Sequence, residues 1–118
     1  MSDSELKCTL LWKLCRKHRW GGPITKEGLV DLALKSSDQG RGKSVVEELI
    51  QEPYITLTRN NGYRVKNDPD SQAQAAYRLT TTCRYDEFRV EATLSRFKSA
   101  GGFSAYDEDE VLSELGDW

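Results

Sequence analysis

Apolar residues recur at helical spacing in three successive segments of the N-terminal half. In residues 4–19 the stripe consists of Leu6, Leu10, Leu11, Leu14 and Cys15. The stripe of residues 26–35 consists of Leu29, Leu32 and Ala33, and that of residues 43–52 of Val45, Val46, Leu49 and Ile50. Because positions i, i+3 and i+4 share one face of a helix, the pattern predicts three amphipathic helices around a common core.

Capping and turn residues separate these helices. Thr25 is suited to the N-cap of the second helix. Residues 36–42, with the sequence SSDQGRG, are rich in Ser, Asp and Gly, and we expect a loop there. Pro53 marks the end of the third helix, because the residue before a proline is disfavoured in the helical conformation.

The segment YITLTRNNGYRV, residues 54–65, predicts two short strands and a turn. A two-residue turn at Asn61 and Gly62 would leave apolar side chains on both faces of the ribbon. A three-residue loop, Asn60-Asn61-Gly62, with Gly62 in the left-handed conformation, places them all on one buried face. That face is formed by Ile55, Leu57, Tyr63 and Val65, and the outer face by Thr56, Thr58, Arg64 and Lys66.

The C-terminal part predicts further helices. Residues 72–82 carry alanines at helical spacing. Residues 86–99 favour a helix with Asp86 at the N-cap, although FRVEATL also alternates as a strand does. Residues 106–118 have acids in a first turn and apolar residues on one side, which is typical of a short amphipathic helix.

Composition places the chain among single-domain, well-solvated globular proteins. It has 118 residues, of which 37% are apolar and 31% charged. No apolar run approaches the roughly 20 residues that a membrane span needs. The start, MSDSELK, lacks the features of a secretion signal, so the cytoplasm is the expected location and no membrane partner is expected.

Charge is divided unevenly along the chain. Residues 1–98 hold all 17 lysines and arginines and 13 acids, whereas residues 99–118 hold 6 acids and no base. Such asymmetry hints at a nucleic-acid-binding body with an acidic interaction tail.

Cysteine usage and motif searches favour neither a cofactor nor an enzyme. Cys8, Cys15 and Cys83 form an odd set without an export signal, so reduced thiols are expected rather than disulfides. Cys8, Cys15 and His18 match no zinc-ligand spacing, and no metal or cofactor is expected. GRGKS is only a partial P-loop, because Ser37 stands where that pattern needs glycine. No acid, base and nucleophile constellation stands out.

The segments GPITKEGLVDLAL, GKSVVEELIQEPYI and ITLTRNNGYRV give three helices followed by a twisted hairpin. In this order the chain resembles the winged helix-turn-helix superfamily over roughly residues 5–67. The resemblance implies an α+β fold, mostly α, with a three-helix core, a β-hairpin wing and additional C-terminal helices. Residues 1–68 would be the winged helix domain, 69–100 a helical extension suited to dimerisation, and 101–118 an acidic tail.

The resemblance also implies a double-stranded DNA interface. The third helix would read the major groove, and the wing would lie along the phosphate backbone. The expected contacts are Arg41, Lys43, Ser44, Gln51, Arg59, Arg64 and Lys66. Arg41 and Lys43 are expected at a helix N-terminus, where free N–H groups also favour phosphate. Five such cations would give a log-log salt slope of about −4 to −5.

Two functions stay open. One is a DNA-binding transcriptional regulator, a homodimer on a two-fold site if the extension pairs. The other is a winged helix that binds a protein in a replication or transcription assembly, favoured because Glu47 and Glu48 lie on the reading face. The basic wing attracts RNA as well as DNA. The first helix carries further cations, interpreted as a solvated face: Lys13, Arg16, Lys17 and Arg19.

The acidic tail has two interpretations as well. It packs on its own domain or serves as a solubilising extension, as charge blocks commonly do. Alternatively it docks a partner through Val111, Leu115 and Trp118, or competes with DNA for the basic wing.

Overall fold

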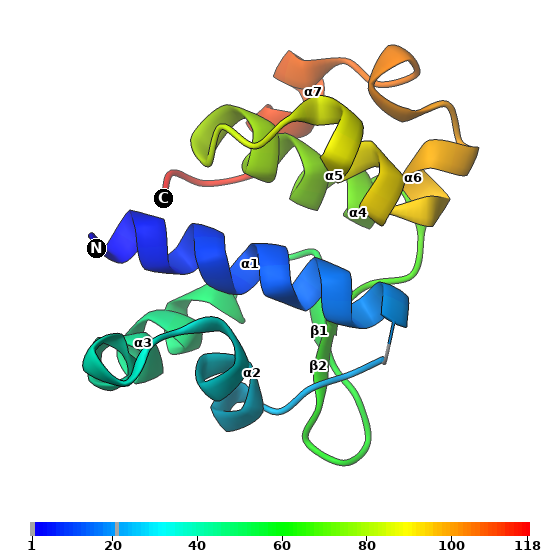
Figure 1. Cartoon of the computed structure of the whole chain (residues 1–118). Helices are drawn as coiled ribbons and strands as arrows, with labels where there is room; N and C mark the ends of the chain where they lie inside the picture. The colour runs from blue at the N-terminus through cyan, green and yellow to red at the C-terminus, as the bar shows by residue number, and fades with distance from the viewer. Residues whose placement is uncertain (1, 21) are drawn as a thin grey trace.

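The computed structural model describes residues 2–20 and 22–118, without the side chains of residues 18–20. A long central helix, α1 (Asp3–Trp20), separates two layers (Figure 1). One layer contains α2 (Lys26–Ala33), α3 (Ser36–Leu49) and a hairpin of β1 (Ile55–Leu57) and β2 (Tyr63–Val65). The other contains α4 (Pro69–Tyr77), the π-helix η1 (Arg78–Thr82), α5 (Glu87–Thr93), α6 (Ser95–Ser99), the 3-10 turn η2 (Gly102–Ser104) and α7 (Glu108–Ser113). The fold is mostly helical with a small two-stranded antiparallel sheet.

The apolar stripe predicted for the first helix is confirmed. Its five members are buried in the core, and α1 contacts both α2 and α3 on one side and η1 and α5 on the other. The leucine-rich face of α1 therefore supplies part of the core of the first layer, while neighbouring positions face the second.

The N-cap of α2 is also confirmed, because the Thr25 hydroxyl accepts a hydrogen bond of 3.0 Å from the Gly28 N–H. The buried face of α2 differs from the prediction. Leu32 is 53% exposed, whereas Val30 and Leu34 are buried. Packing against α1 and α3 selects which apolar residues of α2 are covered, and the short periodic pattern did not identify them.

The expected loop at residues 36–42 is wrong. α3 begins at Ser36, and only Leu34 and Lys35 connect it to α2. Gly42 explains how a glycine-containing segment packs as a helix. A Cβ atom at this position would lie 2.4 Å from Cδ1 of Leu34 and 3.3 Å from Cγ1 of Val30, so the glycine permits a close approach of α3 to α2. Tertiary packing thus overrides the local loop composition.

The four apolar side chains of the hairpin lie on one face as expected, because β1 and β2 pair Ile55 with Val65 and Leu57 with Tyr63. Ile55 and Val65 are buried, whereas Leu57 is 55% exposed. The expected strand alternation is therefore confirmed, but the apolar face is covered only at the base of the hairpin.

The position of the loop and its left-handed residue were predicted wrongly. The loop is residues 59–61, closed by a 2.7 Å hydrogen bond from the Thr58 N–H to the Gly62 carbonyl. Asn61, with φ 57°, takes the left-handed conformation in place of Gly62. Gly62 is needed for another reason: a Cβ atom there would lie 2.8 Å from Cβ of Pro23.

A short backbone bridge anchors the hairpin to the segment before α2. The Ile24 N–H donates to the Tyr63 carbonyl at 3.1 Å, and the Tyr63 N–H donates to the Ile24 carbonyl at 2.7 Å. β2 therefore has pairing partners on both sides, and β1 forms the outer edge.

The C-terminal helices agree with the prediction for residues 72–82, which lie in α4 and η1. Residues 87–93 and 95–99 are helical, so the strand alternative is wrong. The helix is interrupted at Leu94 (φ −105°, ψ 86°), and the Asp86 carboxylate caps it by accepting from the Arg89 N–H at 3.0 Å. α7 begins with three acids in its first turn, as its sequence indicated.

The expectation of three reduced thiols is wrong for one pair. Cys8 of α1 and Cys83, which follows η1, form a disulfide with Cα atoms 5.6 Å apart. They are 75 residues apart in the sequence, so local spacing carried no sign of the pairing. Cys15 is a free thiol whose burial raises its pKa to about 12.

Candidate nucleic-acid interface

The exposed face of α3 carries part of the expected DNA-contacting set. Arg41, Lys43 and Ser44 are exposed on the helix, and Gln51 is exposed just beyond its end. Because α3 begins at Ser36, the two cations lie in its second and third turns rather than at its N-terminus. The expected cooperation between these cations and free N–H groups of a helix start is therefore wrong.

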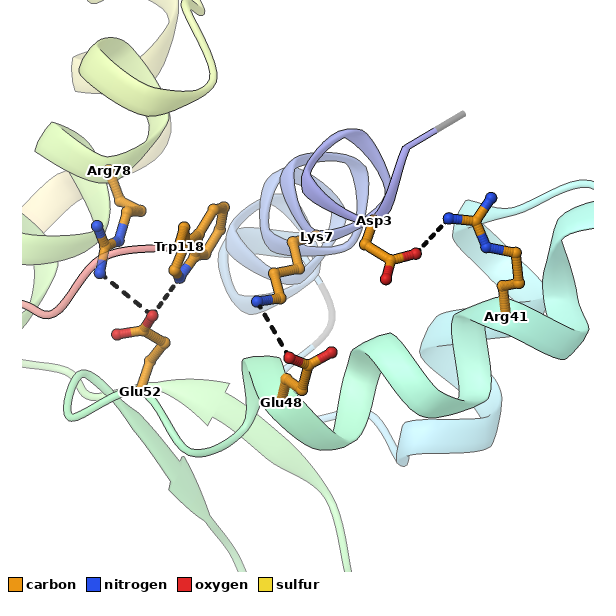
Figure 2. A network of polar contacts seen from close by, with 7 residues as sticks. All are labelled: Asp3, Lys7, Arg41, Glu48, Glu52, Arg78 and Trp118. Atoms are coloured by element: carbon orange, nitrogen blue, oxygen red, sulfur yellow. Dashed lines mark hydrogen bonds and ion pairs between the residues drawn. The ribbon is translucent and has the colours of Figure 1, made fainter.

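Acidic residues from α1 and α3 reduce the positive charge of this face. The Arg41 guanidinium forms an ion pair with the Asp3 carboxylate of α1 (Figure 2). A phosphate that approaches Arg41 therefore competes with this carboxylate for the guanidinium. The sequence did not indicate the pair, because its members lie 38 residues apart.

Both exposed glutamates of α3, Glu47 and Glu48, have cationic partners. Lys26 Nζ of α2 lies 2.5 Å from Glu47 Oε1, and this hydrogen bond raises the pKa of Lys26. Lys7 Nζ of α1 lies 3.5 Å from Glu48 Oε1 (Figure 2). These ion pairs lower the repulsion that the two acids would exert on a phosphate, although they use two cations to do so.

Lys43 differs from Arg41 because no ion pair or hydrogen bond of its ammonium group is found among the described residues. It lies at a hollow of about 320 Å³ between α2 and α3. The hollow is lined by Lys26, Glu27, Val30, Lys43, Val46 and Glu47. Lys43 is therefore a cation of α3 that can meet an anion without breaking an internal ion pair.

The hairpin carries the remaining expected cations. Arg59 at the tip and Lys66 beyond β2 are exposed, and neither has an acidic partner among the described contacts. Arg64 is half-buried opposite Thr56, and its Nε atom is buried without a hydrogen-bond partner in the described part of the chain. Two of the hairpin cations are thus free of internal acidic partners among the described residues, and the third is restricted.

The hairpin, α2 and α3 lie on the same side of α1, and the hairpin tip points away from the C-terminal layer (Figure 1). The acidic helix α7 packs against α4 in that other layer. The acidic helix α7 therefore does not cover the hairpin.

The three apolar tail residues expected to dock a partner pack on the protein itself. Val111 is buried, and Leu115 and Trp118 pack against the core. The Trp118 indole N–H donates to the Glu52 carboxylate, and its ring lies 5.1 Å from the Arg78 guanidinium (Figure 2). This placement agrees with a tail that packs on its own domain.

No metal site is found in the described residues, where no group of three or more His, Cys, Asp or Glu side chains is placed to hold an ion. The side chains of His18 and Arg19 lie outside the description. In residues 2–20 and 22–118, no helix is long and apolar enough to cross a membrane. Comparison with protein-family models, curated proteins and solved structures finds no match.

Proposed function

We propose that the chain is a winged helix protein that binds double-stranded DNA, with the hairpin as the wing and α3 as the reading helix. The observation that carries the proposal is the hairpin itself, which projects beyond the body with Arg59 and Lys66 exposed. The tight connection between α2 and α3 and the bridge between Ile24 and Tyr63 support the same arrangement.

The contacts on α3 are fewer than the sequence suggested. Lys43, Ser44 and Gln51 are exposed and chemically suited to phosphate or base edges. Arg41 contributes only if Asp3 releases it. With Lys43, Arg59 and Lys66 as phosphate contacts, we expect a log-log salt slope of about −3, rather than the value for five contacts.

Salt titration of binding to random duplex DNA tests this proposal. The double variant Arg59→Glu with Lys66→Glu should weaken binding at low salt by tenfold or more and flatten the slope by about 2. A matched control reverses two exposed cations of α6 in the other layer, Arg96→Glu with Lys98→Glu. Equal losses in both double variants would assign the binding to net charge, and no binding at low salt would reject DNA as the ligand.

A second candidate function is a protein-binding winged helix within a replication or transcription assembly. It is favoured by two exposed apolar side chains on the α2 and hairpin layer, Leu32 and Leu57, at 53% and 55% exposure. A DNA-binding surface does not need such residues. Two results together would favour this function. The protein would not bind duplex DNA, and it would be a monomer that loses a protein partner when Leu57 is changed to alanine.

In the first proposal the protein regulates transcription in the cytoplasm and binds a two-fold site as a homodimer. Sedimentation velocity at tens of micromolar, with and without duplex DNA, measures the oligomeric state. If the protein is a monomer under both conditions, the homodimer proposal is wrong. The DNA contacts of the hairpin are tested separately by the salt titration.

A further inference from the structure

Aromatic and arginine side chains gather where α1 and α5 meet, away from the hairpin. The rings of Trp12 in α1 and Tyr85 before α5 have centroids 5.1 Å apart. The Arg89 guanidinium lies 5.5 Å from the centroid of the Trp12 ring. Phe88, next to Arg89 in α5, is 82% exposed, more than any other large apolar side chain in the described part of the chain. An apolar ring of this size in water suggests a ligand surface.

Cations outnumber acids around these rings. Arg16 is exposed one helical turn after Trp12, and Arg84 is exposed directly before Tyr85. We call Trp12, Tyr85 and Arg89, which are in contact, together with their exposed chain neighbours Arg16, Arg84 and Phe88, the aromatic-arginine patch. Lys13 and Lys17 lie beside it on α1. The nearby acids are Asp86 at the N-cap of α5, Glu87 in α5, and Glu5 of α1, which lines a hollow together with Tyr85. No ion pair of the three patch arginines occurs among the described residues.

The backbone at Arg84 is strained. Its φ of 61° lies in the left-handed region, which a residue other than glycine seldom adopts. Its neighbours hold it there: the Tyr85 N–H donates to the Leu79 carbonyl at 2.9 Å, and Cys83 is tied to α1 by the disulfide. Strained residues persist where surrounding structure fixes them, and they concentrate at ligand-binding surfaces.

A hollow of about 250 Å³ borders the Tyr85 ring. It is lined by Ser4, Glu5, Cys8, Thr9, Thr82, Cys83 and Tyr85. Tyr85 belongs to both the hollow and the aromatic-arginine patch, so a flat group stacked on the patch has adjoining space to enter.

We propose that the aromatic-arginine patch binds single-stranded nucleic acid, DNA or RNA. Phe88 and the exposed parts of Trp12 and Tyr85 stack on bases, while Arg16, Arg84 and Arg89 contact phosphates. An unpaired strand offers both unstacked base faces and regularly spaced negative charge. Duplex DNA hides its base faces, and a purely apolar protein surface would not need the arginines. The function is separate from the proposed duplex contact of the hairpin.

Fluorescence anisotropy with labelled strands of about 15 nucleotides tests the stacking. The probes are oligo-dT, oligo-U and an abasic DNA strand of the same length. Wild-type protein should bind oligo-dT or oligo-U about tenfold more tightly than the abasic strand, because the abasic strand offers charge without bases. Phe88→Ala should remove most of this difference, and the preferred base-containing strand identifies the polymer.

Matched variants separate the patch from other surfaces. Leu57→Ala removes an exposed apolar side chain from the hairpin, outside the patch, and should leave the preference for base-containing strands unchanged. The double variant Arg59→Glu with Lys66→Glu should leave the preference for base-containing over abasic strands unchanged while it weakens duplex binding, so failure of the duplex proposal and failure of this one are distinguishable.

Arg84→Gly tests whether Arg84 contributes to strand binding, because this change should raise the stability of the protein while it lowers its affinity for the strands. Glycine accepts the left-handed conformation, so the melting temperature should rise, while binding to all three strands weakens and the salt slope becomes shallower. The proposal is overturned if Phe88→Ala keeps the full preference for base-containing strands, or if wild-type protein binds duplex DNA and single strands equally through this patch. Phe88-dependent self-association without strand binding would overturn it as well and assign the patch to a protein contact.

Discussion

At the scale of single residues, Arg78 is an unusual group because it is a charged side chain with only 5% exposure. Its guanidinium donates to the Glu52 carboxylate at 3.3 Å and to the Gly116 carbonyl, and the Trp118 ring lies beside it (Figure 2). Taking a guanidinium out of water is unfavourable unless a counter-charge and acceptors replace the water. Glu52 therefore matters mainly because it compensates a buried charge.

Removing that counter-charge should be strongly destabilising. We expect Glu52→Gln to lower the free energy of unfolding by roughly 3 kcal/mol, because Arg78 would stay buried without a carboxylate. Urea denaturation measures the change. Glu48→Gln is the control, since the exposed carboxylate of Glu48 should contribute no more than about 1 kcal/mol. Equal effects of the two substitutions would show that the buried pair has no special role.

At the scale of elements, the helix over residues 36–42 depends on a difference between two glycines. Gly40 is exposed, and a Cβ atom there would meet nothing within 4 Å. Gly42 is buried, and its Cβ atom would collide with Leu34. The same substitution should therefore act differently at two positions of one helix.

We expect Gly40→Ala to stabilise the protein by about 0.5–1 kcal/mol, because alanine favours the helical conformation and meets no obstacle. Gly42→Ala gains the same preference but must displace the Leu34 side chain, so its stability should fall below that of Gly40→Ala. Thermal unfolding of both variants checks the order. Destabilisation by Gly40→Ala would contradict a helix at this position.

The predictable parts of the structure are those with local causes. The Leu6, Leu10 and Leu14 spacing identified α1, and the cap at Thr25 needs only the residues beside it. The start of α3 was missed because Gly42 owes its place to packing against Leu34, at the C-cap of α2, and Val30 within α2. At the candidate interface, exposure of Arg59 followed from its place at a turn. The charged residues of α3 form ion pairs with side chains of α1 and α2, which are distant in the sequence, so no local sequence pattern could predict these pairs.

At the scale of the whole molecule, the disulfide between Cys8 and Cys83 connects α1 to the C-terminal layer across 75 residues. In the chain-entropy model, a closed loop of this length stabilises the native state by about 4 kcal/mol. That is a large share of the 5–15 kcal/mol typical of a domain. Cys83 is half-buried beside a hollow, so a small reductant can reach it.

Reduction of the disulfide with a dithiol should therefore lower the melting temperature of the wild-type protein. Cys83→Ser should have a similarly reduced melting temperature, and adding the dithiol to this variant should cause no further decrease. Differential scanning calorimetry with and without reductant measures both. A wild-type transition that is insensitive to reductant would contradict a stabilising disulfide.

The central position of α1 has a consequence for how the chain can be divided. A cut after residue 68 would strip one flank of this helix of its cover, exposing the ring of Trp12 that now lies against Tyr85. Both layers therefore bury their apolar residues against α1, and neither layer has a complete core without this helix. Residues 2–68 and the C-terminal layer should therefore unfold together in a single cooperative transition.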